Sequence, residues 1–119
     1  MPAALDVTIY HNPACSTSRK VLAALQEAGC KITIIEYLKT PPARDELTAL
    51  LKQMDLTPRG ILRRSGTPYD ELGLDDETLT DAQLLDAIEA HPILMQRPVV
   101  VSAKGACLCR PMERYLEVL

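Results

Sequence analysis

The fold of this chain is decided near its N-terminus, where the sequence reads Val7-Thr8-Ile9-Tyr10, then His11-Asn12-Pro13-Ala14-Cys15, then Ser16-Thr17-Ser18-Arg19. The first four residues are β-branched or aromatic and predict a strand. A helical pattern begins near Ser16, so Cys15 stands between a strand and a helix. There its sulfur meets unpaired backbone N–H groups and the positive end of the helix dipole, which both favour the thiolate. Because a first helical turn also suits an oxyanion, the sequence predicts a reactive thiol beside an anion site rather than a buried, inert cysteine.

The composition bounds the class of protein. The 119 residues are 47% hydrophobic and 24% charged, which is typical of one compact globular domain. The net charge of -3 argues against a nucleic-acid partner. The start, Met1 to Asp6, lacks the pattern of a signal peptide, and no apolar run is long enough to cross a membrane. We therefore expect a cytoplasmic protein without a membrane partner, whose four cysteines, at 15, 30, 107 and 109, are reduced.

The spacing of apolar residues predicts a helix and a second strand after the junction at Cys15. Val21, Leu22, Leu25 and Ala28 follow a helical period, and Gly29 stops that helix. A second β-branched run follows at 32–35. A strand, a helix and a strand of these lengths predict a right-handed parallel βαβ unit.

The middle of the chain, at about 41–91, is expected to be a helical insert within a single domain over 1–119. Leu47, Leu50, Leu51 and Met54 have helical spacing. Thr57-Pro58 predicts a short helix that runs to about Leu62. Thr80 and Gln83 form a capping-box pattern for a further helix, whose buried side is expected at Leu84, Leu85 and Ile88.

The last third returns to strand character. Residues 99–102 and 106–110 are expected to form a hairpin around Lys104-Gly105, and Pro111 is expected to open a final helix that ends at Leu119. Together these elements predict an α/β fold with a mixed four-stranded sheet in the order βαβ…ββα.

Several separated motifs, in order along nearly the whole chain, resemble one family. The chain is similar to the glutathione- and glutaredoxin-coupled arsenate reductases (the ArsC family) of the thioredoxin-like superfamily. The family motif has a glycine where this chain has Ser16. The other matching segments are His11-Asn12-Pro13-Ala14-Cys15, Thr17-Ser18-Arg19, Pro41-Pro42-Ala43-Arg44-Asp45-Glu46-Leu47, Leu62-Arg63, His91-Pro92-Ile93-Leu94, Arg97-Pro98 and Leu108-Cys109-Arg110-Pro111.

The resemblance implies an oxidoreductase of arsenic detoxification with Cys15 as its redox-active nucleophile. Arg63, Arg97 and Arg110 match the arginines that clamp the arsenate oxyanion, and guanidinium groups suit such an anion. Pro98 matches the cis-proline of thioredoxin-like folds. The expected co-substrate is glutathione and the expected protein partner is glutaredoxin, with no bound cofactor and no metal. Arg59 and Arg64, which lie beside Arg63 in the sequence, are expected to be surface charges.

Two further residues are candidates for activating the thiolate. His11 is either a polar residue satisfied within its loop or a group that lowers the pKa of Cys15, as an imidazolium or as a hydrogen-bond donor. The resemblance favours the second role. Ser18 occupies the last position of Cys-x-x-Ser, where it is unable to close a disulfide but able to donate a hydrogen bond to the thiolate. A thiol elsewhere must then resolve the intermediate.

The remaining cysteines are expected to be packing residues. Cys107 and Cys109 would point to one face of their strand and Arg110 to the other. A metal site is not expected there, because two further ligands are not evident. Cys30, which follows Gly29, is expected at the surface or in packing.

Other functions remain open on the same fold. One is an Spx-like regulatory module that binds RNA polymerase, although such modules carry Cys-x-x-Cys and this chain has Ser18. Another is an uncharacterised glutathione-linked thiol protein. A phosphatase-type reductase needs Cys-x5-Arg, and position 21 is Val.

Overall fold

The computed structural model describes residues 5–110 and 112–119, which divide into two compact units. The first unit contains the described residues up to Thr40 together with those from Arg97 onward, and the second contains Pro41–Gln96. The second unit covers the region of the expected helical insert, at about 41–91. That the two units make a single domain stays a prediction.

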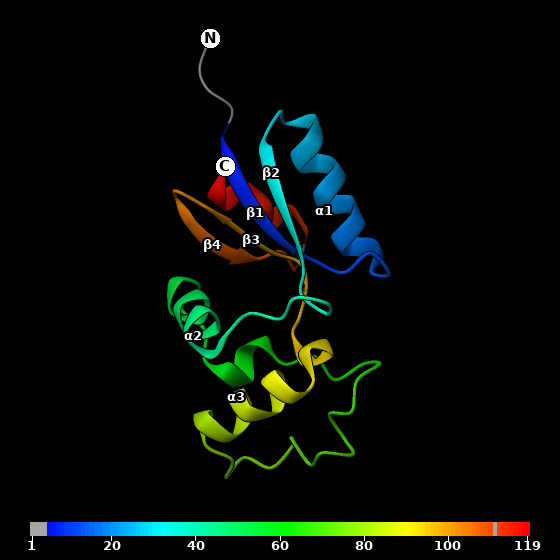
Figure 1. Ribbon diagram of the computed structural model, residues 1–119, viewed down its shortest axis with the longest axis vertical. Coiled ribbons are helices and arrows are strands. Elements are labelled where there is room, and N and C mark those ends of the chain that lie inside the picture. The colour runs from blue at the N-terminus through cyan, green and yellow to red at the C-terminus, as the bar shows by residue number, and fades with distance from the viewer. Residues whose placement is uncertain (1–4, 111) are drawn as a thin grey trace. The chain divides into compact units, whose positions relative to one another are not determined.

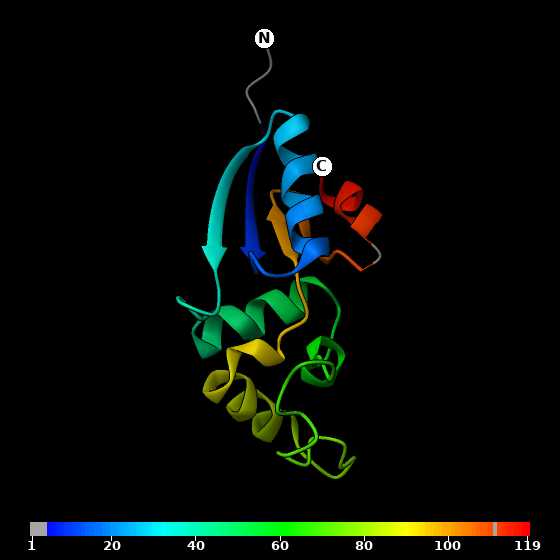
Figure 2. The same cartoon turned by 90° about the vertical axis from the view of Figure 1, so that its right-hand side faces the viewer.

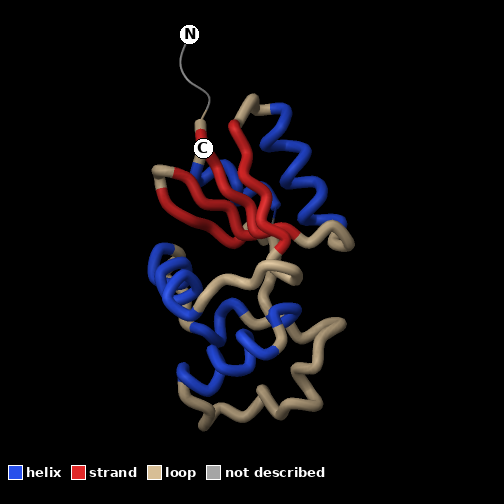
Figure 3. Tube along the Cα trace, viewed as in Figure 1, coloured by secondary structure: helices blue, strands red, loops and turns tan. Residues whose placement is uncertain are grey.

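The first unit is built on the predicted four-stranded mixed sheet, in the order β2-β1-β3-β4 (Figures 1 and 3). β1 runs parallel to β2, with Tyr10 opposite Ile35, and antiparallel to β3, with Tyr10 opposite Val99. β4 pairs antiparallel with β3 and forms one edge of the sheet. The strands are β1 (Asp6–His11), β2 (Lys31–Glu36), β3 (Val99–Ser102) and β4 (Gly105–Leu108).

Two helices cover one face of this sheet and contact each other (Figure 2). They are α1 (Ser16–Glu27) and the 3-10 helix η3 (Met112–Val118). The chain has no Phe or Trp, and the core between these helices and the sheet is aliphatic with two sulfurs: Val7, Ile9, Val21, Leu25, Val100, Cys107, Cys109 and Val118. Gly29 follows the C-cap of α1 with a φ of 76°, a left-handed conformation that glycine adopts without steric cost.

The C-terminal end of the first unit differs from the prediction in two ways. The last strand ends at Leu108 rather than Arg110, because the chain turns there: the Arg110 amide donates to the carbonyl of Leu108 at 2.9 Å. The final helix is a 3-10 helix that ends at Val118, one residue before the expected end. Its expected first residue, Pro111, lies outside the described residues.

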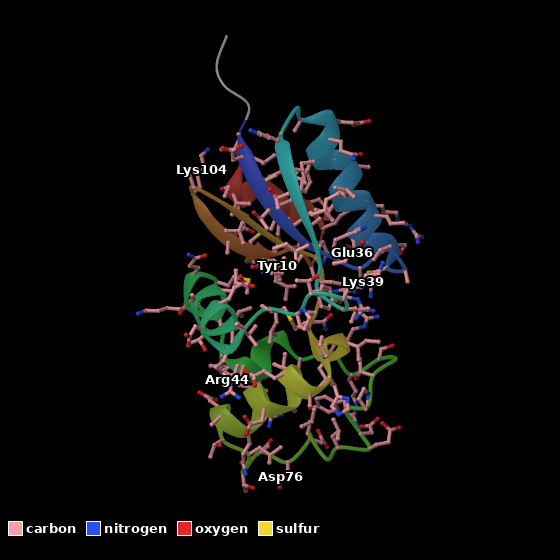
Figure 4. All side chains as sticks on the ribbon, viewed as in Figure 1. Tyr10, Glu36, Lys39, Arg44, Asp76 and Lys104 are labelled. Carbon is pink, nitrogen blue, oxygen red and sulfur yellow. The ribbon has the colours of Figure 1, made fainter. Side chains whose placement is uncertain are left out.

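The second unit contains α2 (Arg44–Gln53), the 3-10 helices η1 (Pro58–Ile61) and η2 (Pro92–Leu94), and α3 (Asp81–Ala90). Both hydrogen bonds of the predicted capping box are present at the start of α3. Arg44, which is labelled in Figure 4, lies at the start of α2. It forms ion pairs with Asp86 and Glu89 of α3.

Between η1 and α3 the second unit is mainly loop and turns (Figure 3). Arg59 holds this loop: its Nη1 donates to the carbonyl of Leu74 and its Nη2 to that of Asp76, both at 2.9 Å. In the described part of the chain, no helix is long and apolar enough to cross a membrane.

Candidate functional site

Cys15 caps the N-terminus of α1, at the junction the sequence predicts. The loop that leads to it is closed by Asn12, which is only 4% exposed. The Asn12 backbone carbonyl accepts from the Cys15 amide, and its side-chain Oδ1 accepts from the Ala14 amide, both at 3.0 Å. This short turn fixes the backbone that presents the sulfur.

The hydroxyl of Ser18 ties the end of β1 to the first turn of α1. It lies 2.6 Å from Nδ1 of His11 and accepts a hydrogen bond from the Asn12 amide at 3.1 Å. Ser18 is fully buried, and it reaches the Cys15 sulfur through its backbone N–H. The sequence analysis expected the hydroxyl to donate to the thiolate. In the structure the hydroxyl is instead hydrogen-bonded to the His11 ring and the Asn12 amide.

His11 is neutral at pH 7. Burial lowers the pKa of its imidazole below the usual value of 6.5, and Glu36 only partly offsets this effect, while Arg19 adds to it. The imidazolium considered from the sequence is therefore not the form present at neutral pH. The position of His11 beside Ser18 leaves it an indirect role, in holding the first turn of α1 in place.

The sulfur of Cys15 is favoured as a thiolate. Burial raises the pKa of the thiol, but the N–H of Ser18, the Arg97 guanidinium and the N–H of Thr17 together outweigh burial and bring the pKa below its ordinary value. Two of these donors belong to the first turn of the helix, as the junction predicted. Cys15 is also partly exposed, so the thiolate is accessible.

Arg97 is the most unusual polar residue of the described chain. It is 9% exposed and lies beside Cys15, yet its Nε and Nη1 have no hydrogen-bond partner. No other buried side-chain nitrogen or oxygen among the described residues lacks a partner. Burying a guanidinium whose N–H groups have no acceptor costs folding free energy, unless a bound anion accepts from them. The Arg97–Pro98 peptide bond is cis, the isomer that the resemblance implies.

Tyr37 is a member of this site that the sequence analysis missed. It is fully buried, and its hydroxyl contacts the side chains of Asn12 and Arg97. Burial raises the pKa of this phenol. The register of the two parallel strands could have identified Tyr37 from the sequence. His11 pairs with Glu36, so the next residues, Asn12 and Tyr37, leave the sheet together at the carboxyl ends of these strands.

Arg110 lies next to Arg97 but in a more open position. Its Nη1 donates to the backbone carbonyl of Arg97 at 3.0 Å, and its side chain is exposed. It lines a pocket of about 300 Å³ together with Thr17 and Lys20 of α1, Met112 and Glu113. The structure thus places the Arg97 guanidinium beside Cys15, and Arg110 against the backbone of Arg97, although the three lie far apart in the sequence.

Arg63 and its neighbours belong to the second unit. Arg63 donates through Nε to the carbonyl of Ser65 at 3.0 Å and through Nη1 to Oε1 of Gln96 at 3.4 Å. Arg64 is a surface charge, as expected, paired with Asp70 at 2.7 Å. Arg59 is not a surface charge, because both of its terminal nitrogens hold the loop after η1. The contribution of Arg63 to an anion clamp stays a prediction.

The other cysteines lie away from these contacts. Cys107 and Cys109 are buried in the core of the first unit, with their sulfurs 3.4 Å apart, and Cys30 is partly exposed. Among the described residues, no group of three or more His, Cys, Asp or Glu side chains is placed to hold a metal ion.

The class of protein follows from the sheet topology and from the thiol that lies at a helix N-terminus beside a buried guanidinium. It is a thioredoxin-like protein built around one cysteine. The ArsC family model matches residues 10–118, and the chain belongs to this family. It is 52% identical to the arsenate reductase of Rhizobium meliloti (strain 1021), over 97% of this chain and 82% of that protein. It is 50% identical to the arsenate reductase of Escherichia coli (strain K12), over 96% and 81%. A solved structure of the Vibrio cholerae arsenate reductase superposes with a TM-score of 0.92 at 42% identity, covering 98% of this chain and 100% of that one.

Proposed function

We propose that this protein is an arsenate reductase, an oxidoreductase in which Cys15 is the nucleophile. One observation carries the proposal: beside the Cys15 sulfur, a buried guanidinium presents two nitrogens that have no protein partner. Arsenate is a tetrahedral anion whose oxygens would accept from those nitrogens. The names and the high identity of the relatives support the same substrate.

Binding would place arsenic next to the sulfur. Arg97 donates to the anion through Nε and Nη1, and Arg110 approaches from the pocket side. The family resemblance supports Arg63 as the third arginine of the clamp. The first-turn N–H groups that favour the Cys15 thiolate would also favour the negative oxygens of a bound anion.

The chemistry would proceed in four steps. The Cys15 thiolate attacks arsenic(V), and one oxygen leaves as water. The thiol of glutathione then replaces a second oxygen, which also leaves as water. A glutaredoxin thiolate attacks the glutathione sulfur, forms a mixed disulfide and leaves the electron pair of the broken As–S bond on arsenic. Water finally cleaves the bond from Cys15 to arsenic(III), which releases arsenite and restores the thiol.

Ser18 explains why outside thiols are needed. A cysteine at its position would close a disulfide with Cys15, whereas a serine is unable to do so, and its hydroxyl is already engaged by His11 and Asn12. Glutathione as co-substrate and glutaredoxin as partner fit a cytoplasmic enzyme of arsenic detoxification, because that compartment keeps both reduced.

A coupled assay with arsenate, glutathione, glutaredoxin, glutathione reductase and NADPH tests the proposal. We expect NADPH oxidation that depends on arsenate, that disappears in Cys15→Ser and that persists in Cys30→Ser, the matched control. Absence of turnover in the unaltered protein, together with its capture by RNA polymerase, would favour the Spx-like alternative. Turnover in Cys15→Ser would contradict the assignment of the nucleophile.

A further inference from the structure

The mechanism leaves unused a pair of thiols in the core of the first unit. Cys107 lies on β4 and Cys109 follows its last residue, so the two are separated by one position. Their sulfurs lie 3.4 Å apart, and the side chains are 3% and 0% exposed. The Cys107 thiol also donates to the backbone carbonyl of Arg114 on η3 at 3.1 Å.

We propose that Cys107 and Cys109 form a second arsenic site, which takes trivalent arsenic as a dithiolate. The supply of this ligand rests on the proposed function, since arsenite is the product of arsenate reduction. The affinity of the two thiols for arsenic(III) is independent of that function, because it depends only on the two sulfurs and on the softness of arsenic(III). Soft thiolates are the ligands that soft, electron-rich centres prefer.

The distance between the sulfurs suits one shared arsenic atom. Two thiolates bound to tetrahedral zinc at about 2.3 Å lie about 3.8 Å apart. Three-coordinate arsenic has narrower bond angles because of its lone pair, so its sulfurs lie closer together. The 3.4 Å observed between the two Sγ atoms therefore needs little adjustment on binding.

The reaction balances without an oxidant or a reductant. Neutral arsenite, As(OH)₃, exchanges two hydroxyls for two sulfurs: two As–S bonds form, two As–O bonds and two S–H bonds break, and two waters leave. Arsenic stays trivalent and keeps one hydroxyl. The departing hydroxyls take up the thiol protons, so the core receives no net charge.

The state of the thiols favours such an exchange. The hydrogen bond between the two sulfurs lowers the pKa of Cys107 and raises that of Cys109. One sulfur of the pair therefore reaches the nucleophilic thiolate form more readily than the other. Attack by Cys107 would come first, and the neighbouring Cys109 would close the ring.

Entry requires local opening, and the fold offers a place for it. β4 is an edge strand with one neighbour, and the sulfurs are covered by η3. A 3-10 helix of seven residues is longer than is common for its hydrogen-bond geometry, so η3 is a candidate for opening below the global unfolding free energy. Movement of η3 would break the Cys107–Arg114 contact and uncover both sulfurs.

The experiment adds arsenite directly to the full chain carrying Cys15→Ser and Cys30→Ser, which keeps only this pair of thiols. A phosphine reductant replaces thiol reductants, which would compete for arsenic. Native mass spectrometry after gel filtration should show one arsenic per chain with the loss of two waters. X-ray absorption at the arsenic edge should show two sulfur neighbours and one oxygen.

The controls separate this site from the reductase site. Cys107→Ala or Cys109→Ala, added to the same background, should abolish the adduct, and circular dichroism checks that each variant is folded. Two results overturn the proposal even if the alanine variants fail to fold. One is a mass spectrum of the two-thiol variant without bound arsenic, and the other is an absorption spectrum that shows three oxygen neighbours around arsenic. Because no arsenate is reduced, failure here leaves the proposed function standing, and failure of the coupled assay leaves this site standing.

Discussion

At the scale of single residues, Arg97 connects the Cys15 thiolate to the anion site that we propose. Replacing it by glutamine removes the guanidinium that helps to lower the pKa of Cys15, so we expect the pKa of the thiol to rise. Loss of a charged hydrogen-bond donor should also reduce arsenate use by about tenfold to a hundredfold. The pH midpoint of Cys15 alkylation and the KM for arsenate measure the two effects.

Arg64→Gln is the matched control, because that arginine is 60% exposed and paired at the surface. It should change neither the alkylation midpoint nor the KM. Arg97→Gln should keep or raise the melting temperature, since it removes a buried charge with unpartnered nitrogens. A large loss of stability would show that the role of Arg97 is structural.

Tyr37, which directly follows β2, contacts the same guanidinium through its hydroxyl. Tyr37→Phe keeps the ring and removes the hydroxyl that contacts Asn12 and Arg97. We expect a cost of about 1 kcal/mol in the free energy of unfolding. The alkylation midpoint of Cys15 should also rise, because Arg97 loses a contact that holds it. Tyr115→Phe on η3 is the control; an equal midpoint shift there would contradict a positioning role for Tyr37.

The position of Cys15 was predictable from the sequence, because a strand-to-helix junction is a local feature. Arg97 and Arg110 were candidates on the family resemblance alone, and their role in binding an anion stays a prediction. The partner of the Ser18 hydroxyl was not predictable, since it depends on how the end of β1 meets α1 in three dimensions. Tyr37 was missed for a similar reason, because its role depends on the register between two strands.

At the scale of secondary-structure elements, α3 depends on its capping box. Thr80→Ala removes the hydroxyl that accepts from the Gln83 amide, and we expect a loss of about 1 kcal/mol in the free energy of unfolding. Thr48→Ala on α2 is the control, because its hydroxyl bonds only to a carbonyl one turn back and should cost less. Urea unfolding of both variants measures the difference; equal losses would show that the cap contributes little.

The elements themselves followed from the sequence wherever periodicity and capping agreed. The strands at 7–10, 32–35 and 99–102 and the capped helix after Thr80 are confirmed by the structure. Predictions were less accurate near the C-terminus. There the turn after Leu108 and the 3-10 geometry of η3 depend on backbone hydrogen bonds that apolar spacing does not encode.

At the scale of the whole molecule, His11 makes stability depend on pH. Its folded pKa lies below the unfolded value of 6.5, so its contribution is complete above pH 6.5 and is lost as the pH falls toward the folded pKa. His11→Asn removes this titration. We therefore expect the difference in unfolding free energy between the natural chain and the variant to shrink on acidification. Urea unfolding at pH 8 and pH 5.5 measures it, and a constant difference would contradict the inference.

The pairing of β1 with β3 has a consequence for synthesis on the ribosome. Val7 pairs with Ser102, 95 residues later, while the whole of the second unit lies between them in the chain. Pairing partners so distant form slowly, because a long loop must close first. During translation, β1 therefore emerges long before β3, and its antiparallel edge waits unpaired until the whole second unit and β3 have been made. The nascent chain exposes an apolar strand edge throughout that interval, in which it is most open to chaperones and to aggregation.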